Sequence, residues 1–172
     1  MADSRQVVPL RVLTVSQPWA SLIALGAKRV ETRSWGTAYR GTVAIHAAKG
    51  FPADMRRDEV RTLAAMEPFR SALVAGGARC FDDLPRGAIV ATATLTDIGQ
   101  VPLAAGRWPE RLRDRVTIDE LAFGDLEPGR FGWLLDDVQQ LATPVPARGA
   151  LGLWRAPTDV AAAVAEVVRR GV

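Results

Sequence analysis

The 172-residue sequence is poor in several residues on which secreted proteins and many enzymes rely. Cys80 is the only cysteine, so an intrachain disulfide and a cysteine-rich zinc site are both excluded. It is expected to act as a small, half-buried apolar residue. His46 is the only histidine, so a Ser-His-Asp triad or a histidine-based metal site has at most one imidazole. We therefore expect neither a bound metal nor a cofactor.

Long apolar runs and glycine-rich phosphate loops are also missing. No apolar segment approaches the roughly 18 residues that a membrane-spanning helix needs. The first residues, MADSRQVVPLR, lack the basic-then-apolar pattern of a signal peptide. The sequence contains no P-loop or Rossmann motif, and it lacks the repeated strand–helix–strand pattern of a doubly wound sheet. These absences favour a cytoplasmic protein without membrane contact.

Basic residues are unevenly distributed, and only two of the 22 are lysines. Residues 1–50 hold seven basic and two acidic residues, whereas residues 51–150 hold twelve basic and fifteen acidic ones. A basic first third suggests an anionic partner such as a phosphate backbone. The alternative is a solvated, arginine-rich surface.

The hydrophobic pattern predicts an α+β fold with a small barrel or strongly curved sheet. The expected strands are 10–15, 28–35, 41–48, 87–98, 131–143 (with a bulge at 136–137) and 149–155. The expected helices are 17–25, ended by Gly26, then 52–75, broken at Pro68, 109–122 and 159–170. The composition of residues 99–129 indicates an insertion, or a segment that leaves the sheet.

Several short motifs together resemble one known family. They are Gln17-Pro18-Trp19-Ala20, the spaced run Gly26, Lys28, Glu31, Arg33 and Trp35, then Tyr39-Arg40-Gly41, Ile45-His46-Ala47, residues 87–90 and residues 131–154. Over roughly residues 10–155 the chain resembles the ASCH domain. The resemblance implies a PUA-like β-barrel with a short helix closing a cleft and with flanking helices. We expect one domain over residues 1–156, with residues 157–172 as a C-terminal helix packed on it or appended to it.

The resemblance also implies a function, which is nucleic-acid binding in a basic cleft, with RNA favoured over DNA. A monomer is favoured over an oligomer, and protein partners are possible. Some similar proteins are hydrolases: one branch removes acetyl from N4-acetylcytidine with a lysine, a threonine three residues later and a distant glutamate, and another is a ribonuclease. Lys28 matches that lysine, Glu31 stands at the threonine position, and the candidates for the glutamate are Glu110, Glu120 and Glu127.

Lys28, Glu31 and Arg33 form the candidate polar site. Lysine offers a point charge, arginine a planar fork for phosphate or a base edge, and glutamate can accept from an exocyclic amine. Strict strand alternation places Lys28 on the face opposite Glu31, unless the turn after Gly26 redirects it. If it converges with Glu31, the two can bind a polar ligand or act as an acid–base pair. The alternative is a structural ion pair.

Neighbouring residues are expected to complete a cleft formed by helix 17–25, strand 28–35 and loop 36–41. Trp19, Trp35 and Tyr39 are candidates to stack on a base, although Trp19 is also a plausible core residue. Arg40 and Lys49 are candidate phosphate ligands. The helix start at Gln17 offers free N–H groups to a phosphate. His46 completes the predicted set, with a buried core histidine as the alternative.

Three functional hypotheses remain open at this point. The first is a nucleic-acid-binding module, whose affinity is expected to fall steeply with salt. The second is a small hydrolase that uses Lys28 and Glu31. The third is a protein-interaction adaptor that docks through residues 99–129.

Overall fold

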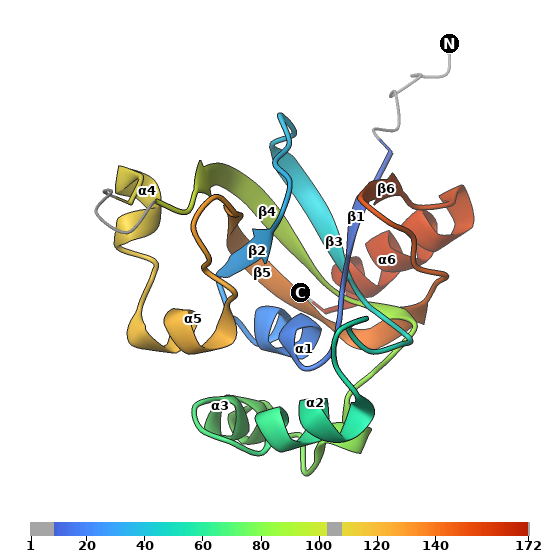
Figure 1. Ribbon diagram of the computed structural model, residues 1–172. Helices are drawn as coiled ribbons and strands as arrows, with labels where there is room; N and C mark the ends of the chain where they lie inside the picture. The colour runs from blue at the N-terminus through green and yellow to red at the C-terminus, as the bar shows by residue number, and fades with distance from the viewer. Residues whose placement is uncertain (1–8, 103–107, 172) are drawn as a thin grey trace.

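The computed structural model describes residues 9–102 and 108–171. In chain order the elements are β1 (Arg11–Val15), α1 (Trp19–Ala24), β2 (Val30–Arg33), β3 (Gly41–Ala47), α2 (Arg57–Ala64), α3 (Phe69–Ala75), the 3-10 helix η1 (Phe81–Asp83), β4 (Ala88–Gln100), α4 (Glu110–Arg113), α5 (Ile118–Phe123), β5 (Phe131–Pro146), β6 (Leu153–Arg155) and α6 (Thr158–Arg170). Figure 1 shows α1 in front of a curled sheet, with α2 and α3 below it, α5 beside it and α6 on the other side.

Over the described residues, the sheet has six strands in the order β2-β5-β4-β3-β1-β6. Only β1 and β3 run parallel, and every other pair is antiparallel. The long strands β4 and β5 bend through three register shifts, because extra residues in a ladder increase its local twist. The expected α+β class with a strongly curved sheet is confirmed, and the sheet forms a half-barrel whose edges are β2 and β6.

Most predicted elements are present, with three differences. The strand expected over 28–35 is limited to Val30–Arg33, since only these four residues pair with β5. The strand expected over 149–155 is shortened to β6. The helix expected over 109–122 is two short helices, α4 and α5. The helical run 52–75 is broken at Pro68 into α2 and α3, as predicted. The predicted bulge at 136–137 is confirmed, because Asp137 has φ 48° and the β4–β5 register shifts beside it.

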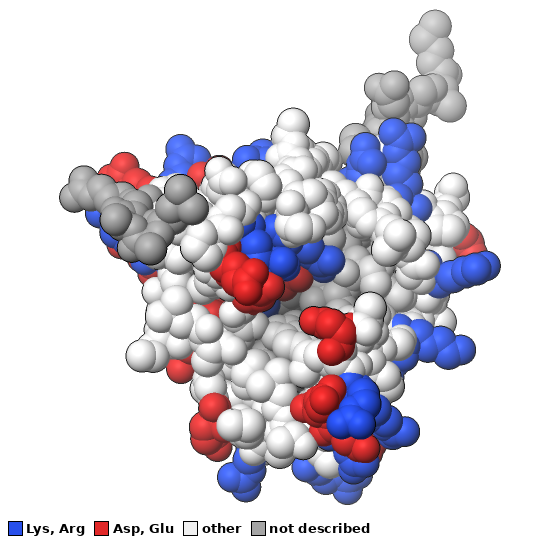
Figure 2. Space-filling view, viewed as in Figure 1, with Lys and Arg blue, Asp and Glu red and all other residues white. Residues whose placement is uncertain are grey.

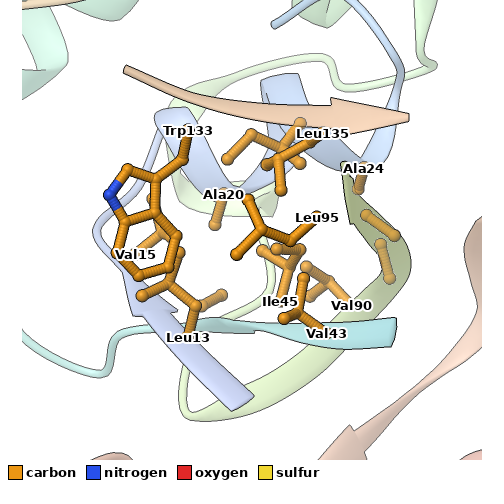
Figure 3. Close-up of a cluster of buried hydrophobic side chains, with 14 residues drawn as sticks. Leu13, Val15, Ala20, Ala24, Val43, Ile45, Val90, Leu95, Trp133 and Leu135 are labelled. Carbon is orange, nitrogen blue, oxygen red and sulfur yellow. The ribbon is translucent and has the colours of Figure 1, made fainter. Parts of the chain in front are cut away.

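The main core lies between α1 and the concave face of the sheet. Figure 3 shows its apolar side chains converging from β1, β3, β4 and β5 on Ala20 and Ala24 of α1. Trp133 is fully buried there, and its indole N–H donates to the carbonyl of Trp35 at 3.2 Å. Since α1 is only six residues long, this packing rather than intrinsic helix propensity holds it in place. Gly26, with φ 73°, ends the helix as predicted.

The remaining helices cover the rest of the sheet and the open side of α1. Leu22 of α1 packs with α2 and α3, while Val164 of α6 packs on Val12 and Ala44. The described residues between β4 and β5 leave the sheet, as expected, and form α4 and α5. Leu112 of α4 packs on Val30 and Leu134, whereas Phe123 of α5 packs among α1, α2 and α3. Over residues 9–102 and 108–171, the helices are too short or too polar to cross a bilayer.

Candidate functional site

A pocket of about 480 Å³ opens beside α1, and we call it the first pocket. Its walls come from the end of β1, the start of α1, β2 with the residues around it, the segment before α2, and the end of α5. Figure 2 shows the hollow near the centre of this face, with basic and acidic residues at its edge. Five of the predicted site residues line it, namely Trp19, Lys28, Glu31, Arg33 and Trp35.

Lys28 lies at the bottom of this pocket, and its side chain is 1% exposed. The backbone of Lys28 is bonded to α1, since its N–H donates to the carbonyl of Leu22. Its Nζ donates to the carbonyl of Val30 and lies 3.8 Å from Oε2 of Glu31 and 3.9 Å from Oε2 of Glu120. Lys28 is therefore a buried cation between two carboxylates.

The meeting of Lys28 and Glu31 depends on where β2 begins. Strict alternation would put the two side chains on opposite faces, but pairing with β5 starts only at Val30. The turn after Gly26 leaves Lys28 outside the ladder, so its side chain is free to fold back toward Glu31. The two side chains therefore converge, as expected if the turn after Gly26 redirects Lys28.

Glu120 of α5 also belongs to the site. The sequence had left it as one of three candidates, beside Glu110 and Glu127. Its Oε1 accepts from the backbone N–H groups of Arg29 and Val30, the second at 3.2 Å. Its Oε2 is buried without a hydrogen bond among the described residues. Burial raises the pKa of the Glu120 carboxyl, although Lys28 and the two amides act in the opposite direction. Of the three candidates, only Glu120 has a carboxylate within ion-pair distance of Lys28 in the described chain.

Arg33 extends this set of charges toward the mouth of the pocket. Its Nη2 lies 3.1 Å from Oε1 of Glu31 and donates to the carbonyl of Thr14 at 2.6 Å. The Nε of the same guanidinium is buried and has no partner among the described residues. Charges thus alternate along the series Glu120, Lys28, Glu31, Arg33. This arrangement offers both donors and acceptors to a ligand.

Aromatic side chains form part of the pocket wall. The indole N–H of Trp19 donates to the carbonyl of Phe123 at 2.7 Å, and its ring meets Phe69 edge to face. Trp35 meets the buried Trp133 in the same way, with ring centroids 4.7 Å apart. Both tryptophans are half-buried, so each is held by the fold and still presents part of its ring to the pocket.

The lining of the first pocket is balanced in charge, which corrects the expected basic cleft. Its three cations are Lys28, Arg33 and Arg130, and its three carboxylates are Glu31, Asp54 and Asp125. The positive charge of residues 1–50 does not make this pocket basic, because the exposed carboxylates of Asp54 and Asp125, from later segments, also line it.

Three predicted residues lie outside the lining of this pocket. Gln17 is 1% exposed, and its amide bonds to Ser21 and to the carbonyl of Pro85, which stabilises the start of α1. Tyr39 donates to the carbonyl of Thr42, and Arg40 lies 3.5 Å from Asp97. The loop 36–41 therefore does not form the cleft wall that was expected of it.

His46 and Lys49 line a different pocket of about 860 Å³, which we call the second pocket. It lies where β3 ends, against the residues that follow β5. His46 is 1% exposed, and its Nε2 lies 3.0 Å from the carbonyl of Ala147. Burial lowers the pKa of this imidazole, which favours the neutral ring.

Comparison with known proteins agrees with the fold and with the motifs. The sequence model of the ASCH domain matches residues 13–115, so the chain belongs to the ASCH domain family. Activating signal cointegrator 1 from Homo sapiens and from Mus musculus are 25% and 24% identical to it over 148 residues. The match covers 86% of this chain and 22% of each relative, so the chain spans about a fifth of their length.

Solved structures show the same fold. The crystal structure of ASCH from Zymomonas mobilis superimposes with a TM-score of 0.51 at 15% sequence identity, covering 92% of this chain and 94% of that one. Two point mutants of the same protein give a TM-score of 0.50. At this identity the likeness shows the fold alone.

Proposed function

We propose that this domain binds RNA by taking a single unpaired base into the first pocket. The observation that carries the proposal is the paired series Lys28, Glu31 and Arg33, which runs from the bottom of a pocket toward its mouth, with tryptophans in the wall. Burying such charges costs free energy unless they are paired, and in a binding pocket the buried charges can also contact a ligand. RNA is proposed over DNA from the family resemblance.

The size and wall of the pocket fit a base. Its volume of about 480 Å³ lies within the roughly 300–1,000 Å³ of small-ligand pockets. Trp19 and Trp35 offer ring surface, and stacking of a base on an aromatic side chain contributes about 1–3 kcal/mol. Single-stranded RNA is recognised mainly through unstacked bases that are inserted in this way.

The charge balance favours a neutral polar ligand over a run of phosphates. Base edges carry donors and acceptors side by side, and the alternating groups of the pocket complement such an edge. Glu31 can accept from an exocyclic amine, while Arg33 can donate to a carbonyl or ring nitrogen. We therefore expect the base itself to bind with little dependence on salt, and any phosphate contacts to lie outside this pocket.

Isothermal titration of the four ribonucleosides tests the proposal. Glu31→Gln keeps the shape of the side chain and removes its charge, so the best-bound nucleoside is expected to lose about tenfold or more in affinity. Glu59→Gln on the surface of α2 is the matched control and should bind as the unmodified protein does. Failure of every nucleoside to bind, or equal binding by Glu31→Gln and the unmodified protein, would contradict the proposal.

A second candidate function, hydrolysis of an acylated nucleoside, is favoured by the contact between Glu120 and Lys28. In this scheme Lys28, positioned by Glu120, stabilises the oxyanion of the amide, and Glu31 takes a proton from water. The water oxygen bonds to the carbonyl carbon, the carbon–nitrogen bond breaks, and the leaving amine takes the proton from Glu31. The products are a free acid and a free amine, and no covalent intermediate forms.

Incubation with N4-acetylcytidine tests this second candidate. Release of cytidine and acetate, with a loss of about 10²-fold or more in Glu31→Gln, would support it. A parallel incubation with end-labelled RNA tests the ribonuclease form of the hypothesis. If both substrates stay intact, the enzymatic function is refuted while base binding is unaffected.

A further inference from the structure

The second pocket differs from the first in the charges that line it. Among the residues that the structure describes, Lys49 and Arg148 are its only charged lining residues. Both are exposed, and within residues 9–102 and 108–171 neither lies at ion-pair distance from a carboxylate. Arg33 and Arg40, by contrast, are both paired. Two unpaired cations beside one pocket attract an anion.

The position of Arg148 is set by contact between the loop after β5 and the sheet. A Cβ built on Gly149 would lie 2.6 Å from Cε1 of His46 and 3.2 Å from Oγ1 of Thr14. The loop backbone therefore presses on both side chains, which only glycine permits without a shift. His46 also bonds to the carbonyl of Ala147, so the loop is held on each side of Arg148. The cation thus extends from a segment anchored at both flanks.

His46 adds an unused polar atom beside this anchored loop. Because Nε2 faces a carbonyl, the ring proton is assigned to Nε2, and Nδ1 is left as an acceptor. Nδ1 is buried and has no partner among the described residues. A Cβ built on Gly149 would lie 2.9 Å from Nδ1, so the imidazole packs against the loop, and the two cations are the groups that can bind an anion.

The two pockets meet at Thr14, which lines both of them. Its carbonyl accepts from Arg33 on the side of the first pocket. Its hydroxyl oxygen accepts from the indole of Trp154, at 3.0 Å, on the side of the second. Thr14 thus lies between the two pockets, with its backbone carbonyl on one side and its side chain on the other.

We propose that the second pocket binds the phosphodiester of nucleotides that flank the base held in the first pocket, through Lys49 and Arg148. This proposal rests on the proposed function, because it describes where the strand continues beyond the base held in the first pocket. The two pockets then bind different parts of the strand: the first, charge-balanced pocket holds the base, and the second, basic pocket holds the RNA backbone. The salt dependence of binding then arises in the second pocket.

Fluorescence anisotropy of a labelled eight-nucleotide single-stranded RNA, measured across a series of salt concentrations, tests the proposal. Each phosphate contact on a single strand contributes about 0.7 to the slope of log affinity against log salt. The double variant Lys49→Ala/Arg148→Ala is therefore expected to reduce that slope by about 1.4. The control Arg111→Ala/Arg113→Ala removes two cations from α4, which lines neither pocket, and should leave the slope unchanged.

Titration of the free ribonucleosides separates the two proposals. A nucleoside carries no phosphate, so its affinity should be the same in the double variant and in the unmodified protein. A slope that depends on Lys49 and Arg148, with no nucleoside binding, would refute the base pocket and retain the phosphate site. An unchanged slope in the double variant, or no binding of the RNA at all, would overturn the phosphate site.

Discussion

Replacing Lys28 with methionine is expected to destabilise the fold strongly. The change keeps a similar side-chain volume and leaves Glu31 and Glu120 without the cation that lies 3.8 and 3.9 Å from them. At about 4 Å and an effective dielectric constant of about 20, each contact is worth about 4 kcal/mol before desolvation is subtracted. Removing one member of a buried ion pair costs about 3–5 kcal/mol, and we expect a loss of free energy of unfolding in this range.

A second substitution shows whether the cost comes from an unpaired buried carboxylate. In the variant Lys28→Met/Glu120→Gln, the new side-chain amide would still accept from the backbone N–H groups of Arg29 and Val30, but it would carry no charge. The double variant is therefore expected to be more stable than Lys28→Met alone. Glu31 keeps its pair with Arg33, so the remaining carboxylate is still compensated.

Urea unfolding followed by tryptophan fluorescence gives the free energies for this cycle. Arg70→Met is the control, since Arg70 and its partner Glu67 are both exposed and their pairing should matter little. The reasoning is refuted if Lys28→Met unfolds at the same urea concentration as the unmodified protein. It is also refuted if Glu120→Gln lowers the stability of Lys28→Met further.

Three further predictions concern pH and packing. Because burial raises the pKa of Glu120, the fold binds its proton more tightly, so the free energy of unfolding should fall as pH rises above the ordinary value of 4.5; Glu120→Gln should flatten this slope in urea titrations. Because burial lowers the pKa of His46, the free energy of unfolding should fall as the pH drops below 6.5, and this fall should be smaller in His46→Gln. Gly149→Ala should cost about 1–3 kcal/mol through its clash with His46, whereas Gly50→Ala, with no atom near its Cβ, should cost little in thermal melts.

Local patterns in the sequence predicted most of the elements. The end of α1 at Gly26, the break at Pro68 and the bulge at Asp137 each follow from a residue's own backbone preference. The burial of Trp133 follows from its place in an apolar strand. Strand ends were predicted less well, because a strand extends only over the residues that pair with its neighbour, and the partner of β2 lies about 100 residues away.

The candidate site was only partly visible in the sequence. The spacing predicted that Glu31 and Arg33 share a face, and that Lys28 joins them only if the turn after Gly26 redirects it; the structure brings all three into one pocket. Tyr39, Arg40, His46 and Lys49 were assigned to the same cleft, yet the first two lie on the loop 36–41 outside the first pocket and the last two line the second pocket. Closeness along the chain misleads here, because the curled sheet turns neighbouring segments to different sides.

Composition and short motifs by themselves determined the α+β class, the family and the buried apolar strands, because these depend on properties that each residue has in any context. Only the tertiary structure decided that Glu120 of α5 reaches Lys28, and that carboxylates from later segments neutralise the first pocket. The contact between Glu120 and Lys28 joins residues that lie far apart in the sequence. The curvature of the whole sheet, and no local preference, determines which of those distant side chains share one pocket.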